Sequence, residues 1–400
     1  MKSIKSLKNT KDKTFLLRAG FDVPMKNEKV IDAKRIKAII PTIKYLASKG
    51  PLVIMSHQGR PNGKIDMSLS LKPLVPVLQK LLGKKVLFAK SCIGVETEKM
   101  THSLKKGQIL LLENLRFEKG EEENDPTFAK ELAKLGDIYV CDAFSDMHRE
   151  HASIVGVPKF LPSYAGFQLF DEIKNLGAVL NTKKHPFLVI LGGAKFETKM
   201  PVIKRFLPVA DHVFIGGALL NDILEVKGYE VGRSLIDKKN SSFLGGQVGR
   251  EKILKNKKLI LPSDVIVRKG NLAKLAIAEF ARCEIAEIGK EDMIIDIGPD
   301  SIKKLESLIK NAKLILWNGP MGKYETEPDK YDATKMILKM IAKSKAFSVI
   351  GGGDTVDLIS EMKMEKKFSF VSTGGGAMLE FLVKGTLPGI KALEHHKGNK

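Results

Sequence analysis

A run of glycines in the second half of the chain has the composition of a phosphate-binding turn. The apolar segment 347–350 predicts a buried strand, and it runs through glycines 351–353 into Asp354 and Thr355. Glycines let a backbone approach a ligand closely, and the free N–H groups at a helix start attract phosphate. Asp354 would repel a polyphosphate unless a divalent cation lay between them, so the segment indicates a metal-bound nucleotide. A plain helix cap is the alternative for Asp354.

Three further apolar segments in this half of the chain also end in glycine. They run into residues 192–195, 216–218 and 372–376. In an open parallel α/β sheet, ligands bind beyond the carboxyl ends of the strands, so the shared pattern predicts one phosphate-bearing cleft. Glycine turns also serve packing alone, which is the alternative for any one of them. Segment 319–324 lacks the spacing and hydroxyl of a P-loop, and no G-x-G-x-x-G follows a strand, which disfavours Ras-like and simple dehydrogenase functions.

Arginine usage in the first 200 residues predicts a second anion site. Only five arginines occur there, in a chain that elsewhere uses lysine for plain charge, and all but Arg35 lie at or just beyond a predicted strand end. A guanidinium presents a rigid fork of donors to phosphate or carboxylate, which lysine cannot reproduce. Structural salt bridges are the alternative. The arginines, and the two histidines expected near them, are Arg18, Arg35, Arg60, Arg116, Arg149, His57 and His151.

The elements that must position these residues alternate between strand and helix in both halves of the chain. Apolar residues at helical spacing predict helices over 33–48 and over 170–181, the second as a link between the halves. The acidic run 118–125 is expected to be a solvated loop that opens a helix. Because 400 residues exceed what one core supports, we expect two doubly wound, parallel-sheet α/β domains of Rossmann-like type, joined by a hinge helix.

Composition restricts the compartment and the class of partner. No apolar run is long enough to span a bilayer, and the basic start 1–8 has no apolar core behind it, so a cytoplasmic location is expected. Cys92, Cys141 and Cys283 form no C-x-x-C pair, which predicts buried thiols and neither a disulfide framework nor a zinc site. The net charge of +21 is spread over nearly every predicted helix, which favours attraction of small anions over specific nucleic-acid binding.

In the order and spacing of its motifs, the chain resembles phosphoglycerate kinases over essentially its whole length. The resemblance implies transfer of the acyl phosphate of 1,3-bisphosphoglycerate to ADP, giving 3-phosphoglycerate and ATP, with Mg²⁺ bound to the nucleotide. It also implies a hinge-bending monomer in which residues 1–169 hold the glycerate, the tail 385–400 packs back on them, and residues 170–384, including the linking helix, hold the Mg-nucleotide. The matching stretches are 18–24, 56–61, 111–117, 142–153, 192–199, 317–325, 351–355, 372–377 and 387–389.

The resemblance also implies roles for individual residues. Positioning and charge neutralisation would do the catalysis, without a nucleophilic side chain. The implied catalytic groups are Arg35, Lys195, Gly352 and Gly375, and the metal-linked carboxylate is Asp354. The phosphoglycerate site falls on Arg35, His57, Arg60, Arg116 and Arg149. The nucleotide site falls on Gly192, Gly193, Ala194, Lys195, Lys199, Gly216, Gly217, Asn318, Pro320, Glu325, Gly351, Gly352, Gly353, Asp354 and Thr355.

The loop after the first strand departs from the family pattern. Where the family has an acid and then an amide, this chain has Gly20 and Asp22. Gly20 cannot accept a hydrogen bond from the substrate hydroxyl, so we hypothesise that Asp22 does, with the surrounding arginines offsetting its repulsion of an anion. The substitutions leave open a catalytically weak paralogue that acts as a nucleotide-dependent binding protein. Every charged group that the mechanism needs is present, which favours an active kinase.

Overall fold

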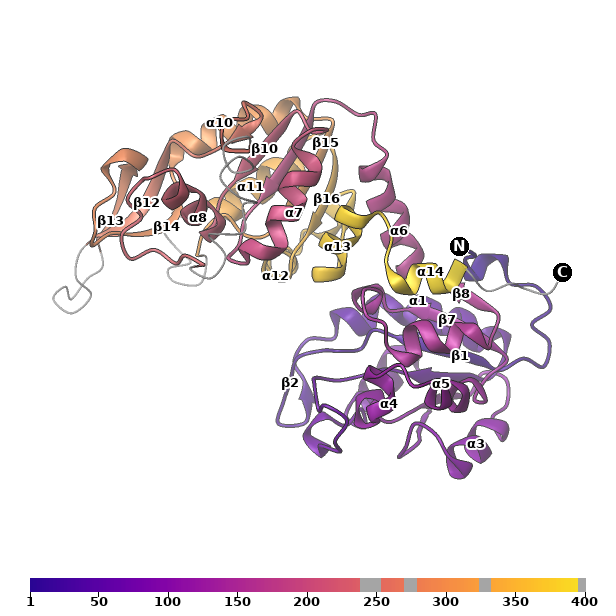
Figure 1. Ribbon diagram of the computed structural model, residues 1–400. Coiled ribbons are helices and arrows are strands. Elements are labelled where there is room, and N and C mark those ends of the chain that lie inside the picture. The colour runs from indigo at the N-terminus through magenta and orange to yellow at the C-terminus, as the bar shows by residue number, and fades with distance from the viewer. Residues whose placement is uncertain (238–252, 270–278, 324–331, 395–400) are drawn as a thin grey trace. The chain divides into compact units, whose positions relative to one another are not determined.

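The computed structural model describes residues 1–237, 253–269, 279–323 and 332–394 (Figure 1). The chain divides into two compact units: unit 1 comprises Met1–Lys174 with Lys384–Lys400, and unit 2 comprises Asn175–Val383. The division falls within helix α6 (Phe167–Leu180), the linking helix that the sequence predicted over 170–181.

Unit 1 is built on a six-stranded parallel sheet with the strand order β5-β6-β4-β1-β7-β8. Every residue of β1, β4, β6 and β7 is buried, as expected for short parallel strands that are covered on both faces. The chain leaves the central strand β1 toward β4 on one side and later returns to β7 on the other, which makes the sheet doubly wound. The strands are β1 (Phe15–Ala19), β4 (Leu52–Met55), β5 (Val86–Phe88), β6 (Ile109–Leu111), β7 (Ile138–Asp142) and β8 (Ser163–Ala165).

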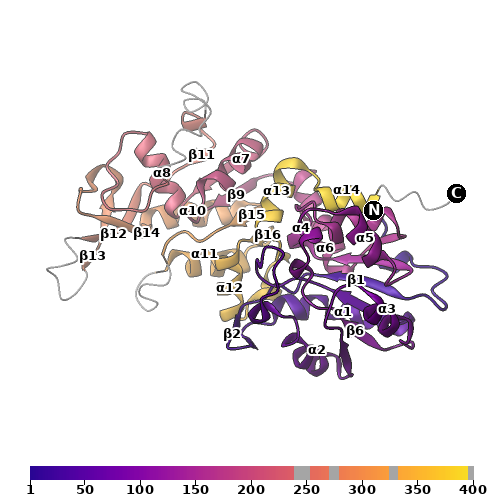
Figure 2. The ribbon, with the colours of Figure 1, turned by 60° about the horizontal axis from the view of Figure 1, so that its bottom comes forward.

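Helices and short turns connect these strands (Figure 2). Helix α1 confirms the helix predicted over 33–48, because Ile36, Ile39, Ile43 and Leu46 all face the core. The helices are α1 (Lys34–Lys49), α2 (Leu74–Leu82), α3 (Val95–His102), α4 (Lys119–Glu122), α5 (Pro126–Ala133) and α14 (Pro388–Glu394). The short turns are η1 (Ile4–Ser6), η2 (Met67–Leu69), η3 (Leu115–Phe117), η4 (Phe144–Asp146), η5 (Ala152–Gly156) and η6 (Val157–Lys159), and β2 (Met25–Lys26) pairs with β3 (Lys29–Val30) in a hairpin.

The acidic run 118–125 opens a helix as predicted, since Asp125 caps α5, but it is not the solvated loop that its composition predicted. Residues Lys119–Glu122 form α4, and Glu121 is completely buried. Its carboxylate accepts hydrogen bonds from the Ser153 N–H at 2.8 Å and from the Ser153 hydroxyl at 2.6 Å. The prediction failed because a charge run is usually solvated, whereas this acid has two donors and a nearby arginine in the interior.

Unit 2 contains a second six-stranded parallel sheet, with the order β11-β10-β9-β15-β16-β17. The chain moves outward from β9 through β10 to β11 and then returns to β15, β16 and β17 on the other side, so the strand order reverses between β9 and β15. The strands are β9 (Phe187–Leu191), β10 (His212–Ile215), β11 (Leu259–Ile260), β15 (Leu314–Asn318), β16 (Phe347–Gly351) and β17 (Phe370–Val371). The helices are α7 (Phe196–Phe206), α8 (Ala218–Val226), α10 (Pro299–Asn311), α11 (Ala333–Lys343), α12 (Gly353–Glu361) and α13 (Gly376–Lys384).

Unit 2 also has a three-stranded antiparallel sheet that the sequence did not predict. Its order is β13 (Glu279–Glu284), β12 (Asp264–Lys269) and β14 (Met293–Ile297). Two short turns, η8 (Ile285–Glu287) and η9 (Glu365–Lys367), complete the described elements. The two parallel sheets confirm the predicted α/β class, and the small sheet is an addition to it.

Two predictions from composition can be compared with the structure. Cys92, Cys141 and Cys283 are free and buried, which confirms the predicted state of the thiols. Among the described residues, no helix combines the length and the apolar character that crossing a bilayer would require.

The returning tail forms α14, which packs on η5 in unit 1. Ile390 and Leu393 are each 4% exposed, and the Gly389 N–H donates to the Met147 carbonyl at 3.0 Å. A Cβ at Gly389 would lie 2.7 Å from both Ile154 and Met147, so the helix sits directly against the turns that follow β7. The tail is therefore part of the unit 1 core.

We predict that Ile390→Ala destabilises the protein by about 2–5 kcal/mol, because it removes buried methyl groups and leaves a cavity. Urea unfolding measures the free energy of unfolding. The exposed neighbour gives a matched control, and Lys391→Ala should change it by no more than about 0.5 kcal/mol. Equal stability of the two variants would show that α14 contributes nothing to the core.

Candidate functional site

Basic side chains gather where the central strands of unit 1 end. His57 follows β4, Arg116 lies in η3 after β6, and Arg18 is the next-to-last residue of β1. His57 and Arg116 are only 2% and 6% exposed, so neither is an ordinary solvated surface charge. Because carboxyl ends of parallel strands meet at one edge, three loops distant in sequence deliver these groups to one place.

Arg18 supports the cluster from the protein interior and is too deeply buried to contact a ligand. It is completely buried and donates to the Ser153 hydroxyl at 3.0 Å and to His57 Nδ1 at 2.9 Å. Its Nη2 also forms an ion pair with Asp146 at 3.2 Å. The sequence grouped Arg18 with the candidate anion ligands, and its burial corrects that interpretation. Since Nδ1 of His57 accepts from Arg18, the proton of the neutral ring is on Nε2.

Electrostatics keep His57 neutral and Asp146 charged. Burial lowers the pKa of His57, and the charges of Arg18 and Arg116 lower it further, against Asp146, to about 4. Burial raises the pKa of Asp146, but His57, Arg18 and Arg116 outweigh that effect and bring it to about 2. Above pH 5, His57 is therefore a neutral N–H donor beside a fixed negative charge.

Asp22 lies within reach of two of the predicted substrate groups, Arg35 and His57. Its Oδ1 accepts from the Gly59 N–H at 3.1 Å, and its Oδ2 is 3.9 Å from both Arg35 Nη1 and His57 Nε2. Arg35 also donates to the Asp22 carbonyl at 2.7 Å. Arg116 donates to the Gly59 carbonyl at 2.7 Å, which ties it to the same loop. The structure thus brings together Asp22, Arg35, His57 and Arg116.

The other predicted groups of unit 1 stand apart from this cluster. Arg60 and Arg149 are exposed, and within the described part of the chain neither forms an ion pair. His151 lies 3.8 Å from the buried Glu121, and burial, with Arg116 and Arg18, lowers its pKa to about 4. Among the described residues, the guanidinium groups of Arg60 and Arg149 therefore have no carboxylate partner.

The glycine turns of unit 2 have two different roles. A Cβ at Gly192 would lie 2.1 Å from the Pro320 carbonyl oxygen, and one at Gly217 would lie 2.5 Å from the Gly193 nitrogen. These glycines are required for packing of one turn on another, which was the alternative that the sequence left open. By contrast, a Cβ at Gly353, Gly375 or Gly376 would meet no atom within 4 Å. The starts of α12 and α13 consequently border open space.

One lysine and two α12 residues provide polar groups at these strand ends. Lys199 of α7 is 6% exposed and donates to the Asn318 side-chain oxygen at the end of β15. Burial, with a contribution from Lys195, lowers the pKa of Lys199 to about 8, against the attraction of Asp354. Asp354 is exposed in the first turn of α12, and the buried Thr355 hydroxyl has no hydrogen-bond partner among the described residues.

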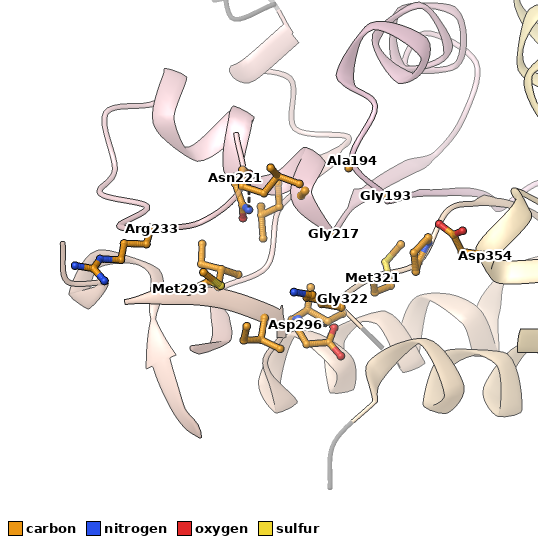
Figure 3. A pocket seen from close by; sticks show the side chains of 18 residues that line it. Gly193, Ala194, Gly217, Asn221, Arg233, Met293, Asp296, Met321, Gly322 and Asp354 are labelled. Carbon is orange, nitrogen blue, oxygen red and sulfur yellow. Dashed lines mark hydrogen bonds between the residues drawn. The ribbon is translucent and has the colours of Figure 1, made fainter. Parts of the chain in front are cut away.

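A cavity of about 460 Å³ opens beside the packed turns (Figure 3). Most of its wall is aliphatic, and its charged and amide side chains are Asn221, Arg233, Asp296, Lys323 and Asp354. Gly193, Ala194, Gly217, Pro320 and Asp354 were predicted and do line it. Glu325 lies outside the described residues. Ala218, Met321 and Gly322 lie in strand-end turns that the sequence also placed at the cleft. Sequence reasoning missed the rest of the wall, namely Leu220, Asn221, Arg233, Leu235, Met293, Ile294, Ile295, Asp296, Ile297 and Lys323.

Comparisons with known proteins agree on one family. The sequence profile of the family "Phosphoglycerate kinase" matches residues 4–385. The phosphoglycerate kinase of Orientia tsutsugamushi strain Boryong is 41% identical over 387 residues, which cover 96% of this chain and 95% of the relative. That of Borrelia garinii subsp. bavariensis is 40% identical over 395 residues, covering 98% and 99%. The solved structure of phosphoglycerate kinase from Coxiella burnetii superposes with a TM-score of 0.85 at 34% identity, covering 99% of each chain.

We predict that Lys199 loses its proton near pH 8 and not near the ordinary value of 10.5, because burial disfavours the ammonium. Its positive charge is present below pH 8 and is lost as the pH rises through that value. Carbon NMR of lysine labelled at Cε measures the titration, and the resonance that is missing from Lys199→Met identifies Lys199. A midpoint close to 10.5 would contradict the description of the site.

Proposed function

The chain belongs to the phosphoglycerate kinase family, and on that premise we propose that each α/β unit binds one of the two substrates. The family's glycolytic reaction transfers a phosphoryl group reversibly from 1,3-bisphosphoglycerate to ADP, giving 3-phosphoglycerate and ATP. The chain is accordingly an ATP:3-phosphoglycerate 1-phosphotransferase. Unit 1 holds the glycerate and unit 2 holds the Mg-nucleotide. The observation that carries the division is that each sheet presents its own anion-binding groups at its carboxyl edge.

The basic groups of unit 1 match a small, highly charged anion. Arg60 and Arg149 are exposed guanidinium groups that can take phosphate oxygens in a bidentate way, and Arg116 and His57 add donors that are already oriented. His57 contributes a neutral N–H, so it can donate without adding charge. Because Arg18, itself paired with Asp146, holds its ring before any ligand arrives, little ordering is required on binding.

The groups of unit 2 match a purine nucleotide. The aliphatic cavity is large enough for a base and part of a ribose, and its walls at Gly193, Gly217 and Pro320 allow close approach. The phosphates are proposed to lie along the turn 192–195, near Lys199, and at the starts of α12 and α13, where N–H groups face open space. Thr355 would then find a partner for its buried hydroxyl. A role for Glu325 stays a prediction.

Asp354 is the proposed contact to Mg²⁺. Among the described residues, no group of three or more histidine, cysteine, aspartate or glutamate side chains is arranged to hold a metal ion. One exposed carboxylate at the edge of the cavity fits a cation that takes most of its ligands from phosphate oxygens and water. When bound, the ion would neutralise nucleotide oxygens, and Asp354 would orient it.

The protein's part in the reaction is positioning and neutralisation of charge. The substrate carboxylate and the nucleotide phosphate supply the attacking and leaving oxygens, and we propose in-line transfer between them. Arg35, Lys195 and the N–H groups at Gly352 and Gly375 are proposed to stabilise the transferring phosphoryl group. Closure of a hinge-bending monomer, expulsion of water, a cytoplasmic location and the absence of a specific nucleic-acid partner are further predictions.

We predict that Arg35→Ala lowers kcat by about 10³-fold or more, because this guanidinium acts on the transition state. A coupled assay with 3-phosphoglycerate and MgATP measures kcat, and calorimetry measures ADP affinity, which should hardly change. Arg205→Ala, an exposed arginine on α7, is the control and should leave kcat unchanged. Loss of ADP affinity equal to the loss of kcat would place Arg35 in the nucleotide site instead.

A second prediction concerns the metal. Asp354→Ala should weaken binding of MgADP by about tenfold or more while affecting metal-free ADP much less, because the carboxylate acts through the cation. Calorimetry with and without Mg²⁺ measures both affinities. Glu361→Gln, on the exposed side of the same helix, should change neither. If both forms of ADP lose affinity alike in Asp354→Ala, Asp354 only caps α12.

A third prediction tests whether Asp22 replaces the acid missing at Gly20. Losing a hydrogen bond to a charged group costs about 1.5–3 kcal/mol, so Asp22→Ala should raise the KM for 3-phosphoglycerate about tenfold or more, with little change for ATP. A Cβ at Gly20 would lie 3.4 Å from Ala143 and 3.6 Å from the Ser145 hydroxyl, which is ordinary contact. Position 20 therefore accepts a Cβ, and Gly20→Asp should recover much of the affinity in the Asp22→Ala background.

One outcome would contradict the hypothesis that Asp22 replaces the acid missing at Gly20. If Asp22→Ala binds 3-phosphoglycerate as well as the parent or better, Asp22 only repels the substrate and the relocation hypothesis is wrong. Such a result would also favour the paralogue with weak catalysis.

A further inference from the structure

Lysines line one edge of the parallel sheet in unit 2. The loops that lead into its six strands meet at the amino edge of the sheet, opposite the carboxyl edge where the glycine turns lie. Five of the six strands have a lysine within the three residues before they begin. These lysines, which we call the lysine row, are Lys184 before β9, Lys257 and Lys258 before β11, Lys313 before β15, Lys345 before β16 and Lys367 before β17. All of them except Lys258 are exposed.

Backbone pairing places the members of the lysine row side by side. Lys313 N–H donates to the Pro186 carbonyl at 2.9 Å, and Phe347 N–H donates to the Lys313 carbonyl at 3.0 Å, so the loops before β9, β15 and β16 are adjacent. Lys184 Nζ lies 4.8 Å from the centre of the Phe347 ring. Because neighbouring strands lie about 4.8 Å apart, the row extends over about 24 Å along six adjacent strands.

Few acids offset this charge. The described loops before the six strands, together with η9, contain two acids, Asp211 and Glu365. The Asp211 carboxylate is already engaged, since it accepts from Phe187 N–H at 2.6 Å and lies 2.6 Å from His185 Nδ1. The lysine row therefore keeps a net positive charge.

Interaction with helix dipoles does not account for the row. Lysine is favoured in the last turn of a helix, and Lys310 and Lys343 occupy that position in α10 and α11. Lys313 and Lys345 are additional lysines that follow the ends of these helices, and both are exposed. The two kinds of lysine add positive charge to the same edge.

The composition of this edge favours an anionic surface over a nucleic acid. Its described loops contain no arginine, and Phe368, their one phenylalanine, tyrosine or tryptophan, is buried. Single-stranded nucleic acids are bound through stacking on exposed aromatic rings and through guanidinium groups. An exposed apolar residue is present instead, because Val209 before β10 is 48% exposed, and Lys258 donates to the adjacent Pro208 carbonyl at 3.1 Å.

We propose that the lysine row docks the protein reversibly on an anionic lipid bilayer, with Val209 facing the lipid head groups. A lysine near such a surface raises the partition coefficient about fivefold, and several of them act together. Docking by the amino edge turns the carboxyl edge of the sheet, and with it the proposed nucleotide site, away from the bilayer. The attraction is electrostatic and needs no segment that enters the hydrocarbon.

Sedimentation of the full chain with lipid vesicles tests the proposal. The parent should bind vesicles made of equal parts of phosphatidylglycerol and phosphatidylcholine and should not bind phosphatidylcholine alone. Raising the salt from about 0.1 M to about 1 M should release it, because the Debye length falls from about 10 Å to about 3 Å. A coupled assay should give the same kcat for every variant, which shows that each is folded.

A triple variant and a matched control locate the binding surface. Lys184→Ala, Lys313→Ala and Lys345→Ala together should weaken vesicle binding about tenfold or more. The control combines Lys290→Ala, Lys303→Ala and Lys304→Ala, which remove the same charge from exposed positions before β14 and in the first half of α10. Its vesicle affinity should stay within about twofold of the parent's, because screening limits the reach of these charges.

Three outcomes would overturn the proposal. A parent that fails to bind the phosphatidylglycerol vesicles, or binds phosphatidylcholine equally well, would refute it without any variant. A folded triple variant with the parent's affinity would show that another surface binds the lipid. If the parent binds single-stranded poly(U) RNA more tightly than the vesicles and the triple variant loses both, the lysine row is a nucleic-acid surface instead.

Discussion

Unit 2 depends on the contact between two backbone turns at the point where its strand order reverses. The turn after β9 and the turn after β15 pack so closely that a Cβ at Gly192 would lie 2.1 Å from the Pro320 oxygen and one at Gly319 would lie 2.4 Å from the Gly192 oxygen. Gly193 N–H donates across this contact to Pro320 at 2.8 Å. Only glycine permits this approach, and the contact fixes one wall of the cavity.

Unit 1 fixes the position of its polar groups with buried charged side chains. Arg18, Asp146 and Glu121 are buried beneath His57, and each is paired or hydrogen bonded. Burying these charges costs free energy that a hydrophobic core would not, so their value lies in holding His57 in one orientation and one tautomer. One unit positions its proposed ligand-binding groups through backbone packing, and the other does so through a buried ionic network. In both, the groups are oriented before a ligand binds.

The sequence predicted the parts of the fold whose signal is local. The central strands of both parallel sheets, such as β4 and β9, are apolar runs that stop at a polar loop or at glycine, and helix α1 follows from the spacing of Ile36, Ile39 and Ile43. The small antiparallel sheet was not predicted because β12 and β14 lack a strict alternation of apolar and polar residues and because their pairing is nonlocal. As a result, the part of the cavity wall that β14 supplies, Met293–Ile297, was not foreseen.

Residue type alone could not distinguish residues that support the site from residues that are open to a ligand. Arg18 and Arg116 look alike in the sequence, but Arg18 lies inside β1 and is covered by neighbouring strands. Gly192 and Gly375 are likewise the same residue with opposite surroundings, since one is packed against a turn and the other faces open space. Glu121 was misassigned because its partner, Ser153, is distant in the sequence. These distinctions come from tertiary packing, which one sequence does not contain.

The central claim is that the two anion sites are separate and that each belongs to one unit. Amide NMR titration of the intact chain with each ligand alone tests this most directly. We expect 3-phosphoglycerate to shift the amides of Asp22, His57 and Arg116 while those of Gly193 and Gly353 stay in place, and MgADP to do the reverse. If 3-phosphoglycerate alone shifts Gly193 and Gly353 as strongly as His57, the assignment of one substrate to each unit is wrong.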